Sequence, residues 1–293
     1  MKGIICINKP FGLTSFHVIA KLRKILNFKK IGHCGTLDPI ATGVLPIFLG
    51  KATKAIQFLP DTDKIYLAGF KLGEMTDSFD FTGTTLLKKK SNVIFNELNS
   101  YLAQFQGTTL QTPPKFSAVK IGGVPAYKLA RCGANFLLKA KKINVTKIYC
   151  KEFDECSQCG IMYVHCSSGT YVRSICNDLG LKLGVGCVMT SLVRVKACGF
   201  SLSDCYSLTQ VEQAMMDGKI SDVVLSLGNV FKNFKYKKIN LNERLKFLNG
   251  ASIKIQNTGN FIQDELVSVF FDDEFLGLSR FKDGFLFVEK LFV

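Results

Sequence analysis

The sequence is poor in histidine and lacks the common nucleotide-binding motifs. Its only histidines are His17, His33 and His165, which leaves little room for a catalytic triad built on histidine. It contains neither a P-loop of the form GxxxxGK[ST] nor a GxGxxG segment that follows a strand pattern. If the protein is an enzyme, a carboxylate therefore has to carry out its chemistry.

Long hydrophobic runs are also missing. No uninterrupted apolar run reaches the roughly 18 residues that a membrane-spanning helix needs. The apolar stretch in the opening MKGIICINKP is too short for a secretory signal. We therefore expect a cytoplasmic protein with no membrane association. Internal repeats of solenoid length and low-complexity tracts are absent as well.

Cysteine, by contrast, is abundant. The 11 cysteines are an odd number and are scattered through apparent strands and helices, which favours reduced, buried thiols over a disulfide framework. Cys156 and Cys159 form a CxxC pair in a predicted hairpin turn, but no second CxxC pair is present to complete a zinc site. We expect no metal and no disulfides, and whether this pair has any role stays open.

The chain carries a large excess of positive charge. Its 38 Lys and Arg residues against 23 Asp and Glu give a formal charge of +15, and such a field attracts polyanions, most commonly nucleic acid. A basic proteome or a solubility requirement is the alternative from composition alone. An anionic membrane surface is a weaker candidate because the sequence shows no amphipathic basic helix of the kind that lies on membranes.

The hydrophobic pattern predicts an α+β protein. With 293 residues and 47% hydrophobic composition, the chain is long enough for one or two domains, and two are expected because residues 226–236 are polar and basic. The expected elements are a strand at 3–8, a helix capped by Thr14 or Ser15, a strand at 64–73, helices at 93–105 and 171–183, a hairpin at 143–167, and a short helix with strand-like runs after 236.

Residues 108–133 form a basic segment with interleaved aromatics, prolines and glycines. Such a segment can be a mobile arm that closes on a nucleic acid, or a solvated connector. The sequence pattern alone leaves both interpretations open.

Asp38 has the most unusual setting of any acidic residue. It is the only carboxylate in GHCGTLDPIATGVLPIFLG, residues 32–50, a run otherwise made largely of Gly, Pro, Thr and aliphatic side chains. An acid among apolar neighbours is costly unless a partner compensates its charge. This setting makes Asp38 the candidate for carboxylate chemistry.

The segment GHCGTLDPIATGVLP closely resembles the signature of the TruB-type tRNA pseudouridine synthases. Further blocks follow the order of that family, and together they cover about residues 3–200: KPFGLTS (9–15), DKIY (63–66), LGEMTDSFDFTG (72–83), PPKFSAVKIGGVPAY (113–127) and CSSGTYVRSICNDLG (166–180). The tail from about residue 235 is similar to the PUA-like RNA-binding domain that ends the bacterial members. Ordered blocks at compatible spacing are far more specific than one short motif.

The resemblance implies a fold, an activity and a domain division. It implies a pseudouridine synthase catalytic domain over 1–228 with a mixed, largely antiparallel sheet and an arm at about 108–133. A small β-rich PUA-like domain would follow over 235–293. The implied reaction converts the T-loop (TΨC) uridine of tRNA into pseudouridine by base flipping, without a cofactor. The implied partner is tRNA, bound at its T-arm or elbow by a monomer with no obligatory protein partner.

The resemblance also implies site residues. Asp38 matches the catalytic aspartate, Arg173 matches the arginine of the TYVR block that pairs with it, and Tyr66 matches the tyrosine that stacks on the target base. The matching substrate-binding positions are His33, Lys54, Asp80, Tyr171 and Leu192. The chain departs from the family at Val193, where an arginine is usual beside the retained Arg194, and at Phe116, where tyrosine is common.

Two rival functions remain open from the sequence. One is a related synthase of the archaeal and eukaryotic type, which works in a guide-RNA complex. The other is an RNA-binding protein or tRNA-folding chaperone whose chemistry is incidental, a role that can coexist with catalysis.

Overall fold

The computed structural model describes residues 1–256 and 260–293. Its strands are β1 Gly3–Lys9, β2 Ile31–His33, β3 Ala41–Leu49, β4 Lys64–Leu72, β5 Glu74–Thr76, β6 Thr85–Lys88, β7 Gly107–Gln111, β8 Lys120–Ile121, β9 Val124–Pro125, β10 Lys141–Asp154, β11 Cys159–Cys166, β12 Cys187–Ala197, β13 Phe200–Ser201, β14 Tyr236–Lys238, β15 Ile253–Lys254, β16 Leu266–Phe271, β17 Glu274–Lys282 and β18 Phe285–Leu291. Its α-helices are α1 Ser15–Ile25, α2 Phe95–Ala103, α3 Ala126–Arg131, α4 Val172–Leu183, α5 Leu208–Met216 and α6 Leu241–Leu248. Short 3₁₀ helices are η1 Gly50–Phe58, η2 Leu202–Asp204, η3 Ile220–Asp222 and η4 Leu227–Asn229.

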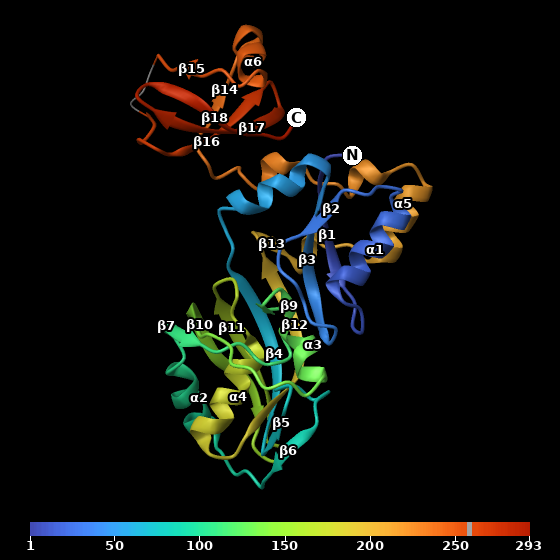
Figure 1. The fold of residues 1–293 in the computed structure, drawn as a ribbon, viewed down its shortest axis with the longest axis vertical. Coiled ribbons are helices and arrows are strands. Elements are labelled where there is room, and N and C mark those ends of the chain that lie inside the picture. The colour runs from blue at the N-terminus through green and yellow to red at the C-terminus, as the bar shows by residue number, and fades with distance from the viewer. Residues whose placement is uncertain (257–259) are drawn as a thin grey trace.

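A nine-stranded mixed sheet forms the body of the molecule. Its main path runs β1-β3-β12-β4-β11-β10-β7, with β2 paired to β3 and β13 paired to β12. Strands β3 and β12 are parallel, whereas the other pairings described in this sheet are antiparallel. The predicted mixed, largely antiparallel sheet is therefore confirmed. Figure 1 shows the sheet extending from the N-terminal strands near the middle of the view to β7 in the lower part.

Helix α1 follows β1 and packs its apolar side into the main core. Thr14 caps the helix by accepting a hydrogen bond from the backbone N–H of His17, one of the two caps predicted from the sequence. Val18, Ile19 and Leu22 are buried. The helix contacts α5 and β2, so its opposite side faces solvent.

Helix α4 packs on the centre of the sheet, and its first turn carries the predicted site residue Arg173. Tyr171 is its N-cap residue, and the helix ends at Gly184, whose φ of 70° is the left-handed conformation that glycine adopts without strain. A Cβ on Gly180 would lie 2.1 Å from the backbone nitrogen of Cys187. This close approach holds the C-terminal part of α4 against the start of β12.

The segment at 108–133 differs from the single arm expected from sequence. Its first residues belong to β7, an edge strand of the main sheet that pairs with β10. Thr108, Thr109 and Leu110 are exposed. The strand therefore lacks the alternation of buried apolar and exposed polar residues by which a strand is recognised in a sequence. The β8–β9 hairpin and α3 make up much of the remainder.

The C-terminal residues form a separate five-stranded sheet in the order β14-β16-β17-β18-β15. This sheet and α6 enclose their own apolar cluster, which includes Phe247, Val267 and Leu286. A second cluster joins it to the main sheet, because Phe275 and Phe292 pack with residues of the N-terminal strands. Figure 1 shows this sheet beyond one end of the main sheet, on the side of the N-terminus.

No helix within residues 1–256 and 260–293 has the length and apolar character needed to cross a membrane.

Candidate active site

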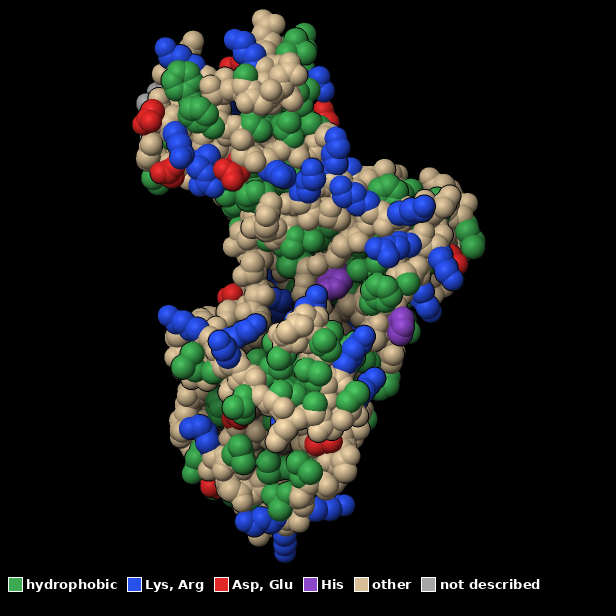
Figure 2. Space-filling view, in the orientation of Figure 1, with side chains coloured by type: hydrophobic (Ala, Val, Ile, Leu, Met, Phe, Trp, Pro, Cys, Tyr) green, Lys and Arg blue, Asp and Glu red, His purple; other side chains and the backbone are tan. Residues whose placement is uncertain are grey.

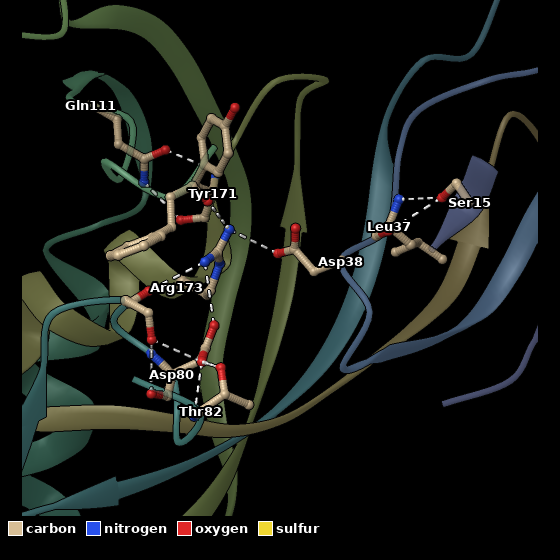
Figure 3. Close-up of polar contacts among 10 residues, drawn as sticks. Ser15, Leu37, Asp38, Asp80, Thr82, Gln111, Tyr171 and Arg173 are labelled. Atoms are coloured by element: carbon tan, nitrogen blue, oxygen red, sulfur yellow. Dashed lines mark hydrogen bonds and ion pairs between the residues drawn. The ribbon is translucent and has the colours of Figure 1, made fainter. Parts of the chain in front are cut away.

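The loop that carries Asp38 connects β2 to β3 and is held by the segment before α1. The Ser15 hydroxyl accepts a hydrogen bond from the backbone N–H of Leu37 at 2.8 Å and contacts its carbonyl at 3.2 Å (Figure 3). On the other side, the N–H of Gly12 donates to the Pro39 carbonyl at 2.8 Å. The backbone is thus fixed on both sides of Asp38.

Arg173 lies between two carboxylates. Its Nη2 is 3.0 Å from Asp38 Oδ2, and its Nη1 is 3.3 Å from Asp80 Oδ2. The same two nitrogens donate to the carbonyls of Phe116 at 3.1 Å and Ser78 at 3.2 Å. Because only 5% of the arginine side chain is exposed, these contacts replace the water that it loses on folding.

Asp80 is the buried member of this pair of acids. Its Oδ1 accepts hydrogen bonds from the Ser78 hydroxyl at 2.9 Å, the Thr82 N–H at 3.0 Å and the Thr82 hydroxyl at 2.6 Å. Its side chain is 6% exposed, whereas that of Asp38 is 36% exposed. Asp80 therefore orients Arg173 from inside the protein, and Asp38 is the carboxylate that a substrate can reach.

The electrostatic setting of Asp38 is a balance of opposing effects. Loss of water around the carboxyl group raises the pKa of Asp38, the charge of Arg173 lowers it, Asp80 raises it and Lys9 lowers it. The net direction is upward from the ordinary value. A carboxylate in this setting is less well solvated than one in water and is held by a directed ion pair, which suits it for reaction at a bound substrate.

Tyr66 lies in the middle of the sheet, in register with Arg194 of β12 and Val164 of β11. Burial raises the pKa of Tyr66 to about 12, and the charge of Arg194 opposes that rise. The hydroxyl is therefore neutral at physiological pH. The charge of Asp38 also raises the pKa of Tyr66.

Tyr171 is fixed by a reciprocal pair of hydrogen bonds with Gln111 of β7. The Tyr171 N–H donates to Gln111 Oε1 at 2.8 Å, and Gln111 Nε2 donates to the Tyr171 carbonyl at 3.0 Å. Burial raises the pKa of the Tyr171 hydroxyl, the charge of Asp38 raises it further, and the charge of Arg173 lowers it. Figure 3 shows Tyr171 and Arg173 on one side of Asp38, with Leu37 and Ser15 on the other.

The remaining predicted site residues are His33, Leu192 and Lys54. His33 ends β2, and burial together with Arg194 lowers its pKa. Leu192 is in register with Ala41 of β3 and Ala68 of β4 and is 7% exposed. Lys54 lies on the exposed side of η1 and makes no ion pair within the described residues. The structure does not join Lys54 to the Asp38–Arg173–Asp80 group.

Two buried cations belong to the site but were not selected from the sequence as site residues. Lys9 is fully buried, and its Nζ donates to the carbonyls of Pro10 at 2.9 Å and Pro39 at 3.3 Å. Burial lowers the pKa of Lys9 to about 8, against the effect of Asp38. Arg194 is also fully buried and donates to the carbonyls of Val44 at 2.7 Å and Gly35 at 3.1 Å. Lys9 lies in the KPFGLTS block, and Arg194 lies beside Val193, a position at which the chain departs from the family; these were the available signals.

The CxxC pair lies at the β10–β11 turn, where Cys156 is exposed and Cys159 begins β11. All 11 cysteines are free thiols. In the part of the chain that the structure describes, no group of three or more His, Cys, Asp or Glu side chains could hold a metal ion.

The sequence was compared with family models and with curated proteins. Residues 23–172 match the model of the N-terminal domain of TruB family pseudouridylate synthases, and residues 173–232 match that of the tRNA pseudouridylate synthase B C-terminal domain. The tRNA pseudouridine synthase B of Dehalococcoides mccartyi is 40% identical over 258 residues, covering 87% of this chain and 85% of the relative. The protein of the same name from Clostridium tetani is 36% identical over 300 residues, covering 99% of this chain and all of the relative.

Solved structures give the same fold. A chain of a Cbf5-Nop10-Gar1 complex superposes with a TM-score of 0.74 at 25% identity, covering 99% of this chain and 85% of the other. A chain of an H/ACA RNP bound to a substrate RNA containing 2′-deoxyuridine gives a TM-score of 0.75 at 24% identity, covering 99% and 85%. The predicted α+β pseudouridine synthase fold is thereby confirmed.

Proposed function

This chain belongs to the TruB family of pseudouridylate synthases, and from this premise we propose that it converts the T-loop uridine of tRNA into pseudouridine. The observation that carries the proposal is the partly exposed Asp38 carboxylate, 3.0 Å from a buried arginine that a second carboxylate orients. Curated relatives that match nearly the full chain are named tRNA pseudouridine synthase B, which supports tRNA as the substrate.

The proposed reaction needs a carboxylate and no cofactor. The bond from the ribose to N1 of uracil breaks, a bond to C5 forms, C5 loses its proton and N1 gains one, so atoms and electrons balance within the substrate. Asp38 acts as an anion beside the ribose, through attack on the sugar, addition to the base or removal of a ribose proton. Arg173 keeps that anion oriented and ionised.

The target uridine has to leave its stack to reach Asp38. Extruding a base from a folded loop costs a few kcal/mol, and stacking on an aromatic surface offsets that cost. Tyr66 supplies an aromatic ring with a neutral hydroxyl next to the position of Asp38. We assign to it stacking on the uracil and a role in removing the C5 proton. Tyr171 and Leu192 line the uridine pocket in this proposal, and His33 contacts the RNA nearby.

We also propose a division of labour between two parts of the chain. Residues 1–228 form the catalytic domain, and the part of its arm that follows β7 closes on the RNA. Residues 235–293 form a PUA-like domain that binds RNA, and the protein acts as a monomer in the cytoplasm. The charge of +15 supplies phosphate contacts, so tRNA binding weakens steeply as salt concentration rises.

A guide-dependent synthase is the second candidate, because solved structures with this fold include chains of multi-component complexes. Sequence identity favours a tRNA synthase that works without a guide RNA. A relative named tRNA pseudouridine synthase B is 40% identical to this chain, whereas the chain of the Cbf5-Nop10-Gar1 complex is 25% identical. Activity of the purified chain on tRNA without any added RNA excludes a guide requirement. A chaperone role is tested by asking whether an inactive variant still accelerates tRNA folding.

The decisive experiment measures tritium release from tRNA labelled at C5 of uridine. The purified wild type should release tritium, whereas Asp38→Asn and a tRNA with cytidine at the T-loop target should give none. Asp273→Asn, on a fully exposed side chain of the C-terminal sheet, is the matched control and should behave as wild type. Turnover by Asp38→Asn at the wild-type rate would overturn the assignment of Asp38.

A further inference from the structure

The first 60 residues have a one-sided charge distribution. They contain nine Lys and Arg residues and one acid, which is Asp38 itself. The cations are Lys2, Lys9, Lys21, Arg23, Lys24, Lys29, Lys30, Lys51 and Lys54. Apart from Lys9, all of them are exposed. Figure 2 shows blue side chains gathered over the region of α1. The neighbouring α5 contributes the exposed acid Glu212 and ends at the exposed Asp217, so this surface is predominantly positive.

Two large aromatic rings lie exposed within this basic region. Phe11, in the turn between β1 and α1, is 63% exposed, and Phe16, near the start of α1, is 66% exposed. An isolated exposed ring on a protein surface needs no explanation. Here, however, both rings belong to the short segment that fixes the Asp38 loop.

That segment is bonded to the loop at several points. Gly12, next to Phe11, donates to the Pro39 carbonyl at 2.8 Å, and Ser15, next to Phe16, bonds the backbone of Leu37. The two rings are therefore carried by one rigid unit with the candidate catalytic residue.

Helix α1 continues this surface with cations. Its buried residues Val18, Ile19 and Leu22 face the core, whereas Lys21 and Lys24 are exposed and have no ion-pair partner in residues 1–256 and 260–293. The rings and these cations thus belong to one short segment and the helix that continues it. Surfaces that bind unpaired nucleotides combine such features, with bases on the rings and phosphates on the cations. An acidic protein would also be attracted by the positive charge, but the rings are carried by the segment that is hydrogen-bonded to the Asp38 loop, which favours RNA as the occupant.

We propose that Phe11 and Phe16 stack on unpaired nucleotides of the substrate tRNA outside the uridine pocket, while Lys21 and Lys24 bind its phosphates. This inference rests on the proposed function and extends it from the target uridine to the neighbouring nucleotides. In this role the two phenylalanines determine substrate affinity and have no part in the chemical step.

The test compares variants on labelled tRNA. A double variant Phe11→Ala, Phe16→Ala should raise KM and Kd for tRNA about tenfold or more, because stacking of one base contributes roughly 1–3 kcal/mol. Its kcat should stay within twofold of wild type. Phe11→Leu, Phe16→Leu keeps apolar bulk without the ring and should show most of the same loss. Lys21→Ala, Lys24→Ala should lower the slope of log Kd against log salt by about two.

The matched control is Phe95→Ala, an exposed ring at the start of α2 whose backbone N–H bonds to Glu155 in the β10–β11 turn. It should leave KM and the salt slope unchanged. Unchanged Kd in both phenylalanine double variants, with an active wild type, would overturn this inference and leave the proposed function intact. The inference would equally be overturned if the variants kept wild-type affinity for tRNA but no longer bound an acidic protein. A wild type that binds tRNA without turnover would instead contradict the proposed function.

Discussion

The guanidinium of Arg173 is shared between Asp38 and Asp80, at 3.0 Å from one carboxylate and 3.3 Å from the other. Asp80 has its remaining oxygen saturated by Ser78 and Thr82, so it acts as a fixed support. Within residues 1–256 and 260–293, Asp38 has no comparable set of donors. The arrangement is therefore directional: the buried acid positions the arginine, and the arginine positions the accessible acid.

Arg173→Lys should reduce kcat by about a hundredfold to a thousandfold, with little change in KM. A lysine ammonium is a point charge and cannot reach both carboxylates and two backbone carbonyls at once, and losing one directed electrostatic contact in an active site has an effect of about this size. Single-turnover tritium release measures the chemical step. Arg280→Lys is the control, since Arg280 pairs with Glu289 at 3.0 Å in the C-terminal sheet. A kcat within threefold of wild type would contradict the role of Arg173.

Asp80→Asn should move the acidic limb of the pH–rate profile to lower pH. Asp38 works as an anion, so activity falls as pH drops through its pKa, which is raised in the folded protein. The charge of Asp80 contributes to that rise, and removing it lowers the pKa of Asp38. Arg173→Ala removes the opposing charge and should shift the limb the other way. The dependence of kcat/KM on pH measures both shifts, and identical limbs in the two variants would refute the coupling.

Much of the fold and of this site could be predicted from sequence, for identifiable reasons. The strand at Gly3–Lys9 and the helix capped by Thr14 follow from local patterns that the structure preserves. Asp38, Asp80 and Arg173 come from separate motif blocks, and the structure brings these three together.

Other features depend on tertiary contacts that no local pattern encodes. Lys9 ends a hydrophobic strand, where a lysine normally reaches solvent. It is buried because the Leu13 and Pro39 carbonyls converge on its ammonium group. Residues Gly107–Gln111 have a polar sequence and form a strand because β10 offers its edge. Lys54 matches a family position, yet its side chain is exposed, and the carboxylates of Asp38 and Asp80 pair with Arg173 instead.

Tyr66→Phe should lower kcat by about tenfold to a hundredfold and leave Kd for tRNA within threefold. The ring that stacks on the base is retained, whereas the hydroxyl assigned to the C5 proton is lost, and general acid–base contributions are about this size or larger. Tyr66→Leu should weaken binding as well. The comparison of kcat with Kd separates the two roles. Tyr163→Phe, on the partly exposed tyrosine in β11, is the control. Equal losses from Phe and Leu would contradict this division.

Lys9→Met should change how stability depends on pH. Folding lowers the pKa of Lys9 from 10.5 to about 8, so between these values the unfolded chain binds more protons than the folded one. The free energy of unfolding of wild type should therefore rise with pH there, by up to about 1.4 kcal/mol per pH unit from this group. The Met variant lacks this contribution, and urea unfolding at several pH values measures the difference. Parallel curves for wild type and variant would contradict it, and Lys30→Met controls for loss of a surface charge.

Phe231→Ala should destabilise both the catalytic body and the C-terminal sheet. Phe231 is fully buried, and its ring centroid lies 5.6 Å from that of Phe275 and 6.3 Å from that of Phe292. These rings belong to the cluster that also contains Ile4 and Phe48 of the N-terminal strands, and truncating a buried phenylalanine costs about 3–5 kcal/mol. Because the cluster spans the proposed boundary, the variant should unfold in one transition at lower urea concentration, measured by circular dichroism. Phe287→Ala, at an exposed position of β18, should change stability by less than about 1 kcal/mol. Loss of the C-terminal transition alone would show instead that the two parts are energetically independent.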